Sequence, residues 1–338
     1  MQVVDEAAIA SPTAAAATVA RSKATQTVRV VGLREEASGV VALELRPADG
    51  DVHPFTAGAH LDLALPNALT RSYSLINAPG DRECYRVAVG LGASSRGGSR
   101  YVHEKMRLGE SLEVSAPRNH FELAPEQSET VLVAGGIGIT PLYAMAQVLA
   151  ERGQAFTMHY ASRTPAHAAF LGALKALPGA TVVTYFNQGA TPQLMDLAAI
   201  ASGSPADAHL YCCGPSGMLD AFIAATADRN PATVHFEHFA ADGAALEAID
   251  SDAFDVVLAR SGKQVHVDTG QSILDAVIAA GVDAAFSCRE GVCGTCETRV
   301  LSGTPVHADS VLTPSEKAAG RSMMICCSRA KGELTLDL

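Results

Sequence analysis

The hydrophobic pattern of the chain changes at residue 131, and this change constrains the fold more than any other feature. Between residues 27 and 127, short runs alternate apolar and polar side chains and end at Gly, Pro or Asp. Such period-two alternation indicates antiparallel strands, which we expect to form a barrel. From residue 131 onward, strand-like apolar runs alternate with helical ones, a pattern typical of a parallel sheet with helices on both faces.

The same patterns predict the individual elements. In the first part we expect strands over residues 26–34, 39–47, 60–66, 70–75, 85–91 and 110–117. In the second part we expect strands over 130–136, 156–162, 181–187, 208–214 and 233–239, and helices over 141–153, 165–177, 192–201 and 217–228.

A third part follows a stretch of small and acidic residues that is typical of an interdomain linker. It predicts a hairpin over 254–268, a helix over 271–281 that ends at Gly281, and a closing strand over 332–338. We therefore divide the chain into a disordered Ala-rich tail and four further segments. These are residues 1–26 for the tail, 27–127 for a barrel, 128–240 for an α/β domain, 241–253 for a linker and 254–338 for a C-terminal domain.

Charge and cysteine content exclude several classes of protein. The net charge of −11 argues against a nucleic-acid binder, which needs a basic face to replace phosphate counterions. Eight cysteines in 338 residues are too few for a disulfide scaffold, and five of them lie between Cys288 and Cys327. This clustering indicates a metal or redox site in a reducing compartment, which predicts a cytoplasmic protein.

Two stretches could be mistaken for membrane or export signals. Residues 131–150 carry no charge and have the length of a membrane span, but three glycines and a proline favour a strand, a tight turn and a buried helix. Asp5 and Glu6 stand where a secretory signal would carry positive charge. We expect neither a membrane span nor a signal peptide.

Three cysteines lie within ten residues of the C-terminal domain. The spacing is Cys288-x4-Cys293-x2-Cys296, and Cys326 follows 29 residues later. A structural zinc site usually carries two CxxC pairs, whereas this spacing matches that of plant-type ferredoxins, which hold a 2Fe–2S cluster. Zinc and a disulfide are the alternatives. Cys327 competes with Cys326 as the fourth ligand, and the spacing favours Cys326.

The residues between these cysteines also suit a cluster. Gly291 and Gly294 let the backbone wrap closely and direct N–H groups at the sulfurs.

A glycine-rich turn follows the first strand of the α/β part. Gly135, Gly136 and Gly138 precede Thr140, which we expect to cap a helix whose first residue is Pro141. The free N–H groups at such a helix start can hold a pyrophosphate, although an ordinary tight turn is the alternative.

Cys213 ends the fourth strand of the same predicted sheet. Ligands of open parallel sheets bind at the carboxyl ends of the strands, so Cys213 is expected beside the ligand of the glycine loop. A purely structural core cysteine is the alternative.

The barrel carries a possible phosphate site. Arg71, Tyr73 and Ser74 share one predicted strand, and Arg96, Gly97, Gly98 and Ser99 form a glycine-rich turn. An arginine together with a glycine-serine turn can hold a phosphate, and Tyr73 can stack on a flat ring. An exposed arginine and an ordinary hairpin turn are the alternatives.

Taken together, these motifs resemble the phthalate dioxygenase reductase family over residues 27–338. These enzymes are reductases of Rieske-type oxygenases, and the vanillate demethylase reductases are near relatives. The resemblance implies a multidomain fold: a flavin-binding antiparallel β-barrel, a ferredoxin-reductase-type parallel α/β nucleotide domain and a C-terminal plant-type ferredoxin domain with a β-grasp fold.

The resemblance also assigns roles to residues. For FMN it implies Arg71, Ser72, Tyr73, Ser74, Ala88, Val89, Arg96, Gly97, Gly98 and Ser99. For NADH it implies the loop of Gly135, Gly136, Gly138, Thr140 and Pro141, with Cys213 near the nicotinamide and Phe239 against the flavin ring. For the cluster it implies Cys288, Cys293, Cys296 and Cys326. The turn "GASSRGGS" departs from the usual phosphate loop of the family.

The implied function is electron transfer from NADH through FMN and the 2Fe–2S cluster to a Rieske-type oxygenase, by a monomer. The alternatives are a haem monooxygenase as acceptor, a redox sensor and a zinc-binding interaction module. Arg163 follows the second strand of the nucleotide domain, where NADP enzymes hold the 2′-phosphate, so NADPH stays open as the donor. We expect the oxygenase to dock around Arg289 and Glu290.

Overall fold

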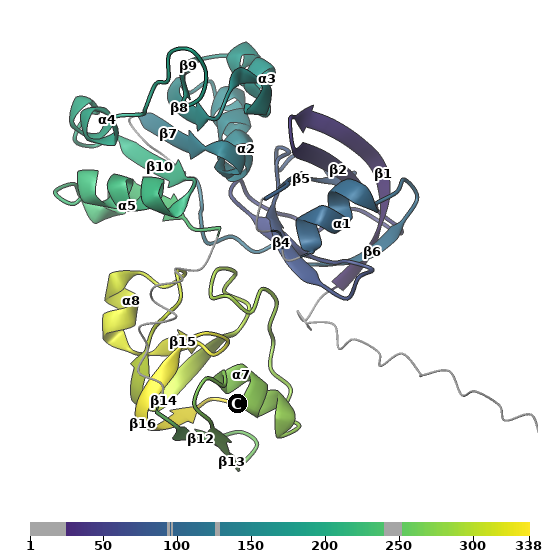
Figure 1. Ribbon diagram of the computed structural model, residues 1–338, viewed down its shortest axis with the longest axis vertical. Coiled ribbons are helices and arrows are strands. Elements are labelled where there is room, and N and C mark those ends of the chain that lie inside the picture. The colour runs from purple at the N-terminus through teal and green to yellow at the C-terminus, as the bar shows by residue number, and fades with distance from the viewer. Residues whose placement is uncertain (1–24, 93–94, 96, 126–128, 240–251) are drawn as a thin grey trace, which may run out of the picture.

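The structure, a computed structural model, describes residues 25–92, 95, 97–125, 129–239 and 252–338. Residues 1–24 of the predicted tail, nearly all of the predicted linker, and Arg96 lie outside the described residues. The described chain forms three sheets that follow one another along the sequence (Figure 1). No helix among the described residues is long and apolar enough to cross a membrane.

The first sheet is an antiparallel barrel, as the alternating runs predict. Its strand order is β4-β3-β6-β1-β2-β5, and a bridge between Leu75 and Val87 joins its two edges. Leu43, Leu61 and Val114 are among the apolar side chains that fill its interior. The elements are β1 (Thr25–Ala37), β2 (Val40–Pro47), β3 (His60–Ala64), β4 (Thr70–Ser74), β5 (Tyr85–Gly90), α1 (Gly98–Glu104) and β6 (Ser111–Ser115).

The second sheet is parallel and has the order β11-β10-β7-β8-β9. Alternate residues of β7 enter two different cores, with Leu132 in one and Val133 in the other. Helices α2 and α3 cover the first core, and α4 and α5 cover the second. The elements are β7 (Thr130–Gly135), α2 (Ile139–Glu151), β8 (Phe156–Ser162), α3 (Leu171–Ala176), β9 (Ala180–Phe186), α4 (Leu197–Gly203), β10 (His209–Cys213), α5 (Ser216–Ala225) and β11 (Val234–Glu237).

The start of α2 differs from the prediction. A 3-10 turn over Gly136–Gly138 runs directly into the helix, so α2 begins at Ile139 and not at Pro141. The prediction that Thr140 caps the helix is wrong. Thr140 lies in the first turn, and its hydroxyl donates a hydrogen bond to the carbonyl of Ile137 (2.9 Å).

Two other helices are shorter than predicted, each for a local reason. Phe170 adopts a left-handed conformation (φ 60°) and stacks its ring on Tyr143, which interrupts the helix predicted over 165–177. The carboxylate of Asp196 accepts a hydrogen bond from the Ala199 amide, so α4 starts at Leu197.

The third sheet is mixed and has the order β13-β12-β16-β14-β15, with α7 packed on it as in a β-grasp fold. Strands β12 and β13 form the predicted hairpin, and Gly281 follows α7 in a left-handed conformation. The elements are β12 (Phe254–Leu258), β13 (Lys263–Val267), α7 (Ile273–Ala279), β14 (Glu297–Val306), α8 (Pro314–Ala319), β15 (Ser322–Met324) and β16 (Arg329–Leu336).

The barrel and the parallel sheet share one core. Ile76, Ala88 and Phe121 of the first part pack in the same cluster as α2, and Phe121 meets Tyr211 of β10 edge to face. The side-chain amide of Gln147 donates a hydrogen bond to the carbonyl of Ile76 (2.7 Å). The buried core of the third sheet draws its residues from 254–338.

Candidate functional site

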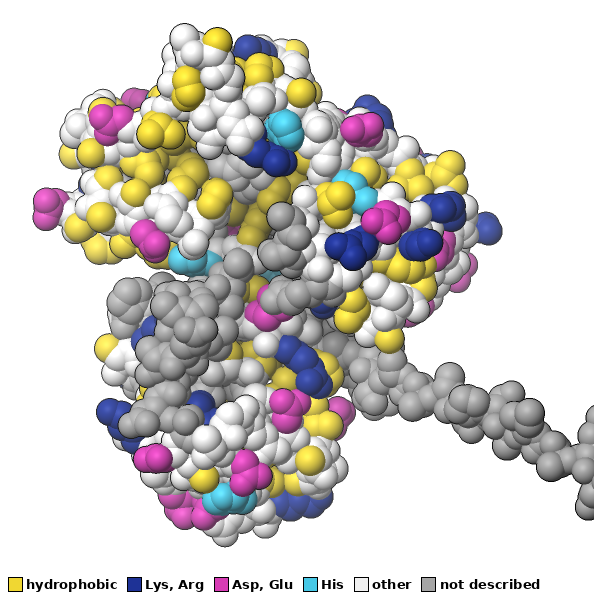
Figure 2. All heavy atoms as spheres, viewed as in Figure 1, with side chains coloured by type: hydrophobic (Ala, Val, Ile, Leu, Met, Phe, Trp, Pro, Cys, Tyr) yellow, Lys and Arg dark blue, Asp and Glu magenta, His cyan; other side chains and the backbone are white. Residues whose placement is uncertain are grey.

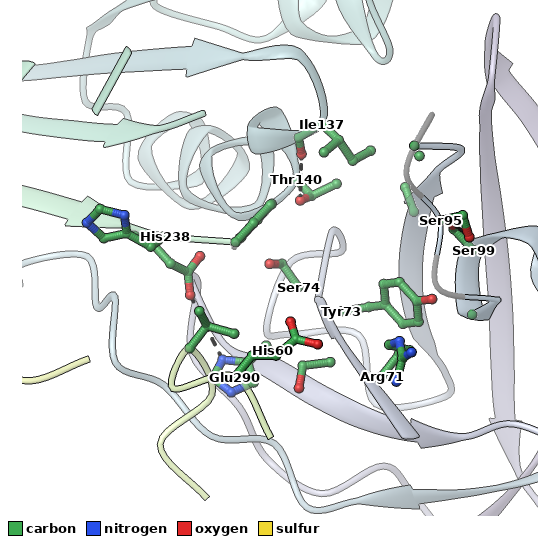
Figure 3. Close-up of a pocket in the computed structure, with 18 residues that line it drawn as sticks. His60, Arg71, Tyr73, Ser74, Ser95, Ser99, Ile137, Thr140, His238 and Glu290 are labelled. Atoms are coloured by element: carbon green, nitrogen blue, oxygen red, sulfur yellow. Dashed lines mark hydrogen bonds and ion pairs between the residues drawn. The ribbon is translucent and has the colours of Figure 1, made fainter. Parts of the chain in front are cut away.

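A cavity of about 280 Å³ lies where the three sheets meet (Figure 3). Strand β4 and the start of α1 supply one side, and the start of α2 and the end of β11 supply another. The cysteine loop completes it with Glu290 and Val292. The lining residues are His60, Arg71, Ser72, Tyr73, Ser74, Ala88, Gly90, Gly92, Ser95, Gly98, Ser99, Ile137, Thr140, Glu237, His238, Phe239, Glu290 and Val292.

The barrel brings together most of the residues predicted for FMN. Because β4 is short and half-buried, Arg71, Ser72, Tyr73 and Ser74 all reach the cavity. Burial raises the pKa of Tyr73 to about 12, so its phenol stays neutral. Ala88 also lines the cavity, whereas Val89 is buried in the barrel core and lines neither this cavity nor the one described below.

The predicted glycine-serine turn leads into a helix that the sequence did not predict. Gly97 precedes α1 with φ 92°, and Gly98 packs so closely on Arg71 that an added Cβ would lie 2.6 Å from the Arg71 Cγ. The Ser99 hydroxyl donates a hydrogen bond to the Ser95 hydroxyl (2.8 Å). Small residues here leave room beside a guanidinium and two hydroxyls, a donor set that suits a phosphate.

A second cavity, of about 210 Å³, lies over the glycine-rich turn of the parallel sheet. Ile137, His238 and Phe239 line both cavities, so the two are adjacent. Phe239 keeps 38% of its surface exposed. The remaining lining residues are Gly135, Gly136, Gly138, Gly214, Pro215, Ser216 and Leu219.

The other residues predicted for the nucleotide lie apart from this second cavity. Thr140 lines the first cavity, and Pro141 is buried in α2 and lines neither. Cys213 ends β10 at the glycine turn, but its side chain is fully buried. Burial raises the pKa of the Cys213 thiol well above its ordinary value. Its carbonyl, rather than its sulfur, meets Gly138.

Two titratable residues of the first cavity were missed by the sequence analysis. His60 begins β3 and Glu237 ends β11, and 4.0 Å separates His60 Nδ1 from Glu237 Oε1. His60 Nε2 and Glu237 Oε2 are buried without a hydrogen-bond partner. Burial, with the nearby Arg118, lowers the pKa of His60 to about 4, and burial raises that of Glu237 to about 8. Both groups are therefore neutral at neutral pH.

The raised pKa of Glu237 predicts how stability depends on pH. The folded state holds this proton up to about pH 8, whereas the unfolded chain loses it near the ordinary value of 4.5. Stability from this group should therefore fall as pH rises between these values, by at most about 1.4 kcal/mol per unit. Between about pH 4 and 6.5 the lowered pKa of His60 contributes the opposite slope, so the fall should appear in thermal unfolding midpoints of flavin-depleted protein from pH 6.5 to 8, and Glu237→Gln should reduce it. An unchanged slope in the variant would contradict the assignment.

The cysteine loop brings four thiols together beside the first cavity. Hydrogen bonding to Cys288 and burial raise the pKa of Cys293, and hydrogen bonding to Cys326 and burial raise that of Cys296. The Cys288 thiol also lies beside that of Cys326. Crowding and burial together favour the neutral form of the Cys293 and Cys296 thiols, and a bound cationic cluster would relieve the crowding.

The loop backbone is shaped to approach these sulfurs. The Glu290 amide donates a hydrogen bond to the Cys288 sulfur (3.3 Å). Gly291 and Gly294 have φ values of 71° and 72°, a conformation that favours glycine. The thiols and the N–H group directed at the Cys288 sulfur are of the chemical types that hold a 2Fe–2S cluster, but among the described residues no three or more Cys, His, Asp or Glu side chains are already arranged around a metal position.

Cys327 lies behind the loop and outside this group of thiols. Its sulfur hydrogen-bonds to the Met324 carbonyl and to the Ser328 hydroxyl. A Cβ added to Gly291 would lie 2.5 Å from the same sulfur. Cys327 therefore packs against the back of the loop, whereas Cys326 is buried beside Cys288 and Cys296.

Comparison with known proteins agrees with this geometry. Residues 132–223 match the oxidoreductase NAD-binding domain, and residues 256–331 match the 2Fe-2S iron-sulfur cluster binding domain. The chain is 46% identical to the phenoxybenzoate dioxygenase subunit beta of Ectopseudomonas oleovorans, over 94% of this chain and 99% of that protein. It is 35% identical to phthalate dioxygenase reductase, with a TM-score of 0.69 over 93% of this chain and 98% of that one. The chain belongs to the phthalate dioxygenase reductase family.

A further solved structure places the same three parts in a larger protein. An intact type IV self-sufficient cytochrome P450 monooxygenase is 41% identical to this reductase, with a TM-score of 0.84. The match covers 93% of this chain and 41% of that one. This reductase is thus an oxidoreductase with an NAD-binding domain and a 2Fe–2S domain, and its family cofactors are FMN, 2Fe–2S and NADH.

The residues that sequence reasoning missed in this reductase share a common feature. His60, Ser95, Glu237, Glu290 and Val292 each stand at the end of a strand or in a loop. His60 and Glu237 belong to no motif with its own spacing, whereas Glu290 and Val292 lie between two cysteines of the cysteine motif and Ser95 lies in the glycine-serine turn.

Proposed function

We propose that the protein is the reductase component of a Rieske-type oxygenase and works as a monomer. One observation carries this proposal: a single cavity is lined by the barrel, by the nucleotide domain and by the cysteine loop. Groups bound at the three sites would be neighbours within one chain. Because the chain completes the cavity by itself, a second copy is not needed for it.

The residues divide the work of binding. We assign Arg71, Ser74 and Ser99, with the Gly97–Gly98 turn, to the polar groups of FMN, and Tyr73 to its ring. The Gly135–Gly138 turn is assigned to the pyrophosphate of NADH. Cys288, Cys293, Cys296 and Cys326 are assigned to the cluster. We further propose domain boundaries at 27–127, 128–240 and 254–338.

When bound, FMN would supply the exchange between the two electrons that NADH gives together and the single electrons that a 2Fe–2S cluster can accept. The protein contributes placement around that chemistry. Phe239 lines both cavities, so its ring covers the place where a nicotinamide and a flavin would meet. The neutral His60 and Glu237 keep fixed charge away from the inner side of the cavity. We assign Cys213 a structural role, because its side chain is fully buried next to the glycine turn.

The Rieske-type acceptor is supported by the relatives of this chain, which serve oxygenases as separate subunits. A haem acceptor is the second candidate, because the self-sufficient P450 matches almost the whole of this chain. We favour the separate oxygenase because the dioxygenase subunit has the length of this chain. All eight cysteines are free, which suits the cytoplasm.

An anaerobic titration tests the proposal. NADH should bleach the flavin absorbance and then produce the low-temperature EPR signal of a reduced 2Fe–2S cluster. A parallel titration with NADPH selects the donor, since Arg163 directly follows β8. Flavin bleaching without the EPR signal would contradict the assignment of the cysteine loop. Adding a purified Rieske oxygenase or a P450 to the reduced protein, and following its reduction, decides between the two acceptors.

A further inference from the structure

The third sheet meets the rest of the molecule in a different way from the other two. Barrel and nucleotide domain share a hydrophobic core that includes Ile76, Phe121 and Met145. The core of the third sheet is built from residues 254–338 alone among the described residues. The cysteine loop must therefore be held against the first cavity by something other than a common core. Figure 1 shows this part set apart from the other two.

His60 makes the first contact that holds the cysteine loop against the cavity. Its Nδ1 lies 4.0 Å from Glu237 Oε1, and the Cys293 backbone lies near enough to the same ring to raise its pKa. The side chain is only 6% exposed, and the Glu237 side chain is 13% exposed. One buried ring thus lies against a residue of the nucleotide domain and a residue of the cysteine loop. Figure 3 shows this ring in the cavity that Glu290 of the cysteine loop also lines.

The second holding contact is made by His120. A Cβ added to Gly294 would lie 2.7 Å from His120 Nε2, so the loop backbone rests directly on this ring. The rings of His60 and His120 are 6.0 Å apart. Two histidines of the first part of the chain therefore support two consecutive residues of the cysteine loop, Cys293 and Gly294.

The support beneath His60 is rigid. Its backbone exchanges two hydrogen bonds with Arg118, both of 2.9 Å. The Arg118 guanidinium pairs with the buried carboxylate of Asp62 (2.7 Å), which also accepts a hydrogen bond from the Ser72 hydroxyl (2.6 Å). Buried, paired groups of this kind hold side chains in one place. Ser72 itself lines the first cavity, so the same network links the flavin side to the histidine side.

We propose that His60 and His120 form a seat that fixes the cysteine loop against the flavin cavity and so sets the rate of electron transfer between them. Both are positioning residues, because they contact the loop backbone and not the sulfurs. This inference rests on the proposed function, since it concerns the step between two of its cofactors. Small displacements matter here, because the rate of electron transfer between two bound cofactors falls steeply as their separation grows.

Rapid mixing of the holoenzyme with NADH tests the seat. His120 lines neither cavity, so His120→Ala should leave flavin bleaching within about twofold of wild type and slow the appearance of the reduced-cluster EPR signal severalfold. His60 lines the flavin cavity, so for His60→Ala the flavin content is measured first. The ratio of the rate of cluster reduction to the rate of flavin bleaching is then compared with the same ratio in wild type. The matched control is His53→Ala, because His53 lines neither cavity and its backbone bonds to the Tyr85 hydroxyl.

A second measurement does not depend on turnover. Amide hydrogen exchange over residues 288–296 of the oxidised holoenzyme should accelerate severalfold in His60→Ala and in His120→Ala, and remain unchanged in His53→Ala. His60→Gln, which restores a donor toward the Cys293 backbone, should recover part of the rate. If the two histidines act as a unit, cluster reduction in the His60→Ala/His120→Ala double variant should be slowed by less than the product of the two single fold-changes.

The outcomes separate this inference from the proposed function. If wild-type protein shows no cluster signal with NADH, the proposed function fails, and the seat fails with it. If wild type shows both phases and both variants keep the wild-type ratio and exchange rate, only the seat is overturned. Slower cluster reduction with lost iron would mean that the histidines stabilise the loop fold, which also overturns the proposal.

Discussion

Replacing Gly138 with alanine should raise the KM for NADH by about ten- to a hundredfold, while FMN and the cluster stay bound. Gly138 has ordinary helical dihedral angles (φ −62°), so the effect is not one of backbone strain. An added Cβ would lie closer than 3.0 Å to the Cys213 carbonyl, which is backbone and cannot rotate away. Overpacking of this kind costs about 1–3 kcal/mol, and 1.4 kcal/mol corresponds to a tenfold change in binding.

Steady-state reduction of an artificial acceptor at varied NADH measures this effect. Gly172→Ala is the matched control, because a Cβ there meets nothing within 4 Å and the residue lies in α3. Its KM should equal that of wild type, and its thermal stability should be unchanged or slightly higher. A Gly138→Ala variant with a wild-type KM would show that NADH does not bind over this turn.

Replacing Cys326 with serine should remove the cluster, whereas replacing Cys327 with serine should leave it in place. Cys326 is buried among the thiols of Cys288 and Cys296. The Cys327 sulfur instead bonds to the Met324 carbonyl behind the loop. Bound iron and the EPR signal after reduction should fall to near zero in Cys326→Ser and stay near wild type in Cys327→Ser.

Flavin bleaching by NADH serves as the internal control for both cysteine variants. It should persist in each, because the flavin cavity contains neither residue. Loss of the cluster in Cys327→Ser with retention in Cys326→Ser would reverse the ligand assignment. Loss in both would mean that Cys327 is needed to support Gly291, against which its sulfur packs.

Much of the fold could be predicted because strands and helices follow from the spacing of apolar residues over short stretches of sequence. The alternating runs of the first part correspond to β1, β2, β3, β5 and β6, and the apolar runs of the second part to its five strands. Helix ends were less predictable. Phe170 interrupts its helix because its ring stacks on Tyr143, a contact between residues far apart in the sequence. No local sequence pattern predicts the left-handed backbone conformation of Phe170.

In the candidate site too, residues of one short motif could be predicted and residues brought together by the tertiary fold could not. Cys288, Cys293 and Cys296 were predictable because metal ligands follow a fixed spacing along one loop. His60 and Glu237 are 177 positions apart and become neighbours only when β3 and β11 meet at the cavity. Their perturbed pKa values come from burial between domains, which a single sequence does not encode in any short window.

In Figure 2 the part of the chain that contains the third sheet forms the lower lobe. Its core consists of its own residues, and this bears on how such a chain can recombine. Genes recombine most safely at points where few side chains depend on both flanks. A break before residue 254 leaves the core of each flank intact, whereas a break near residue 128 divides the cluster that joins Phe121 to Met145. By this criterion residues 25–239 form one unit and residues 254–338 another. A different domain in the place of the third would have to match the surface around His60 and His120 as well as the cavity that Glu290 and Val292 line.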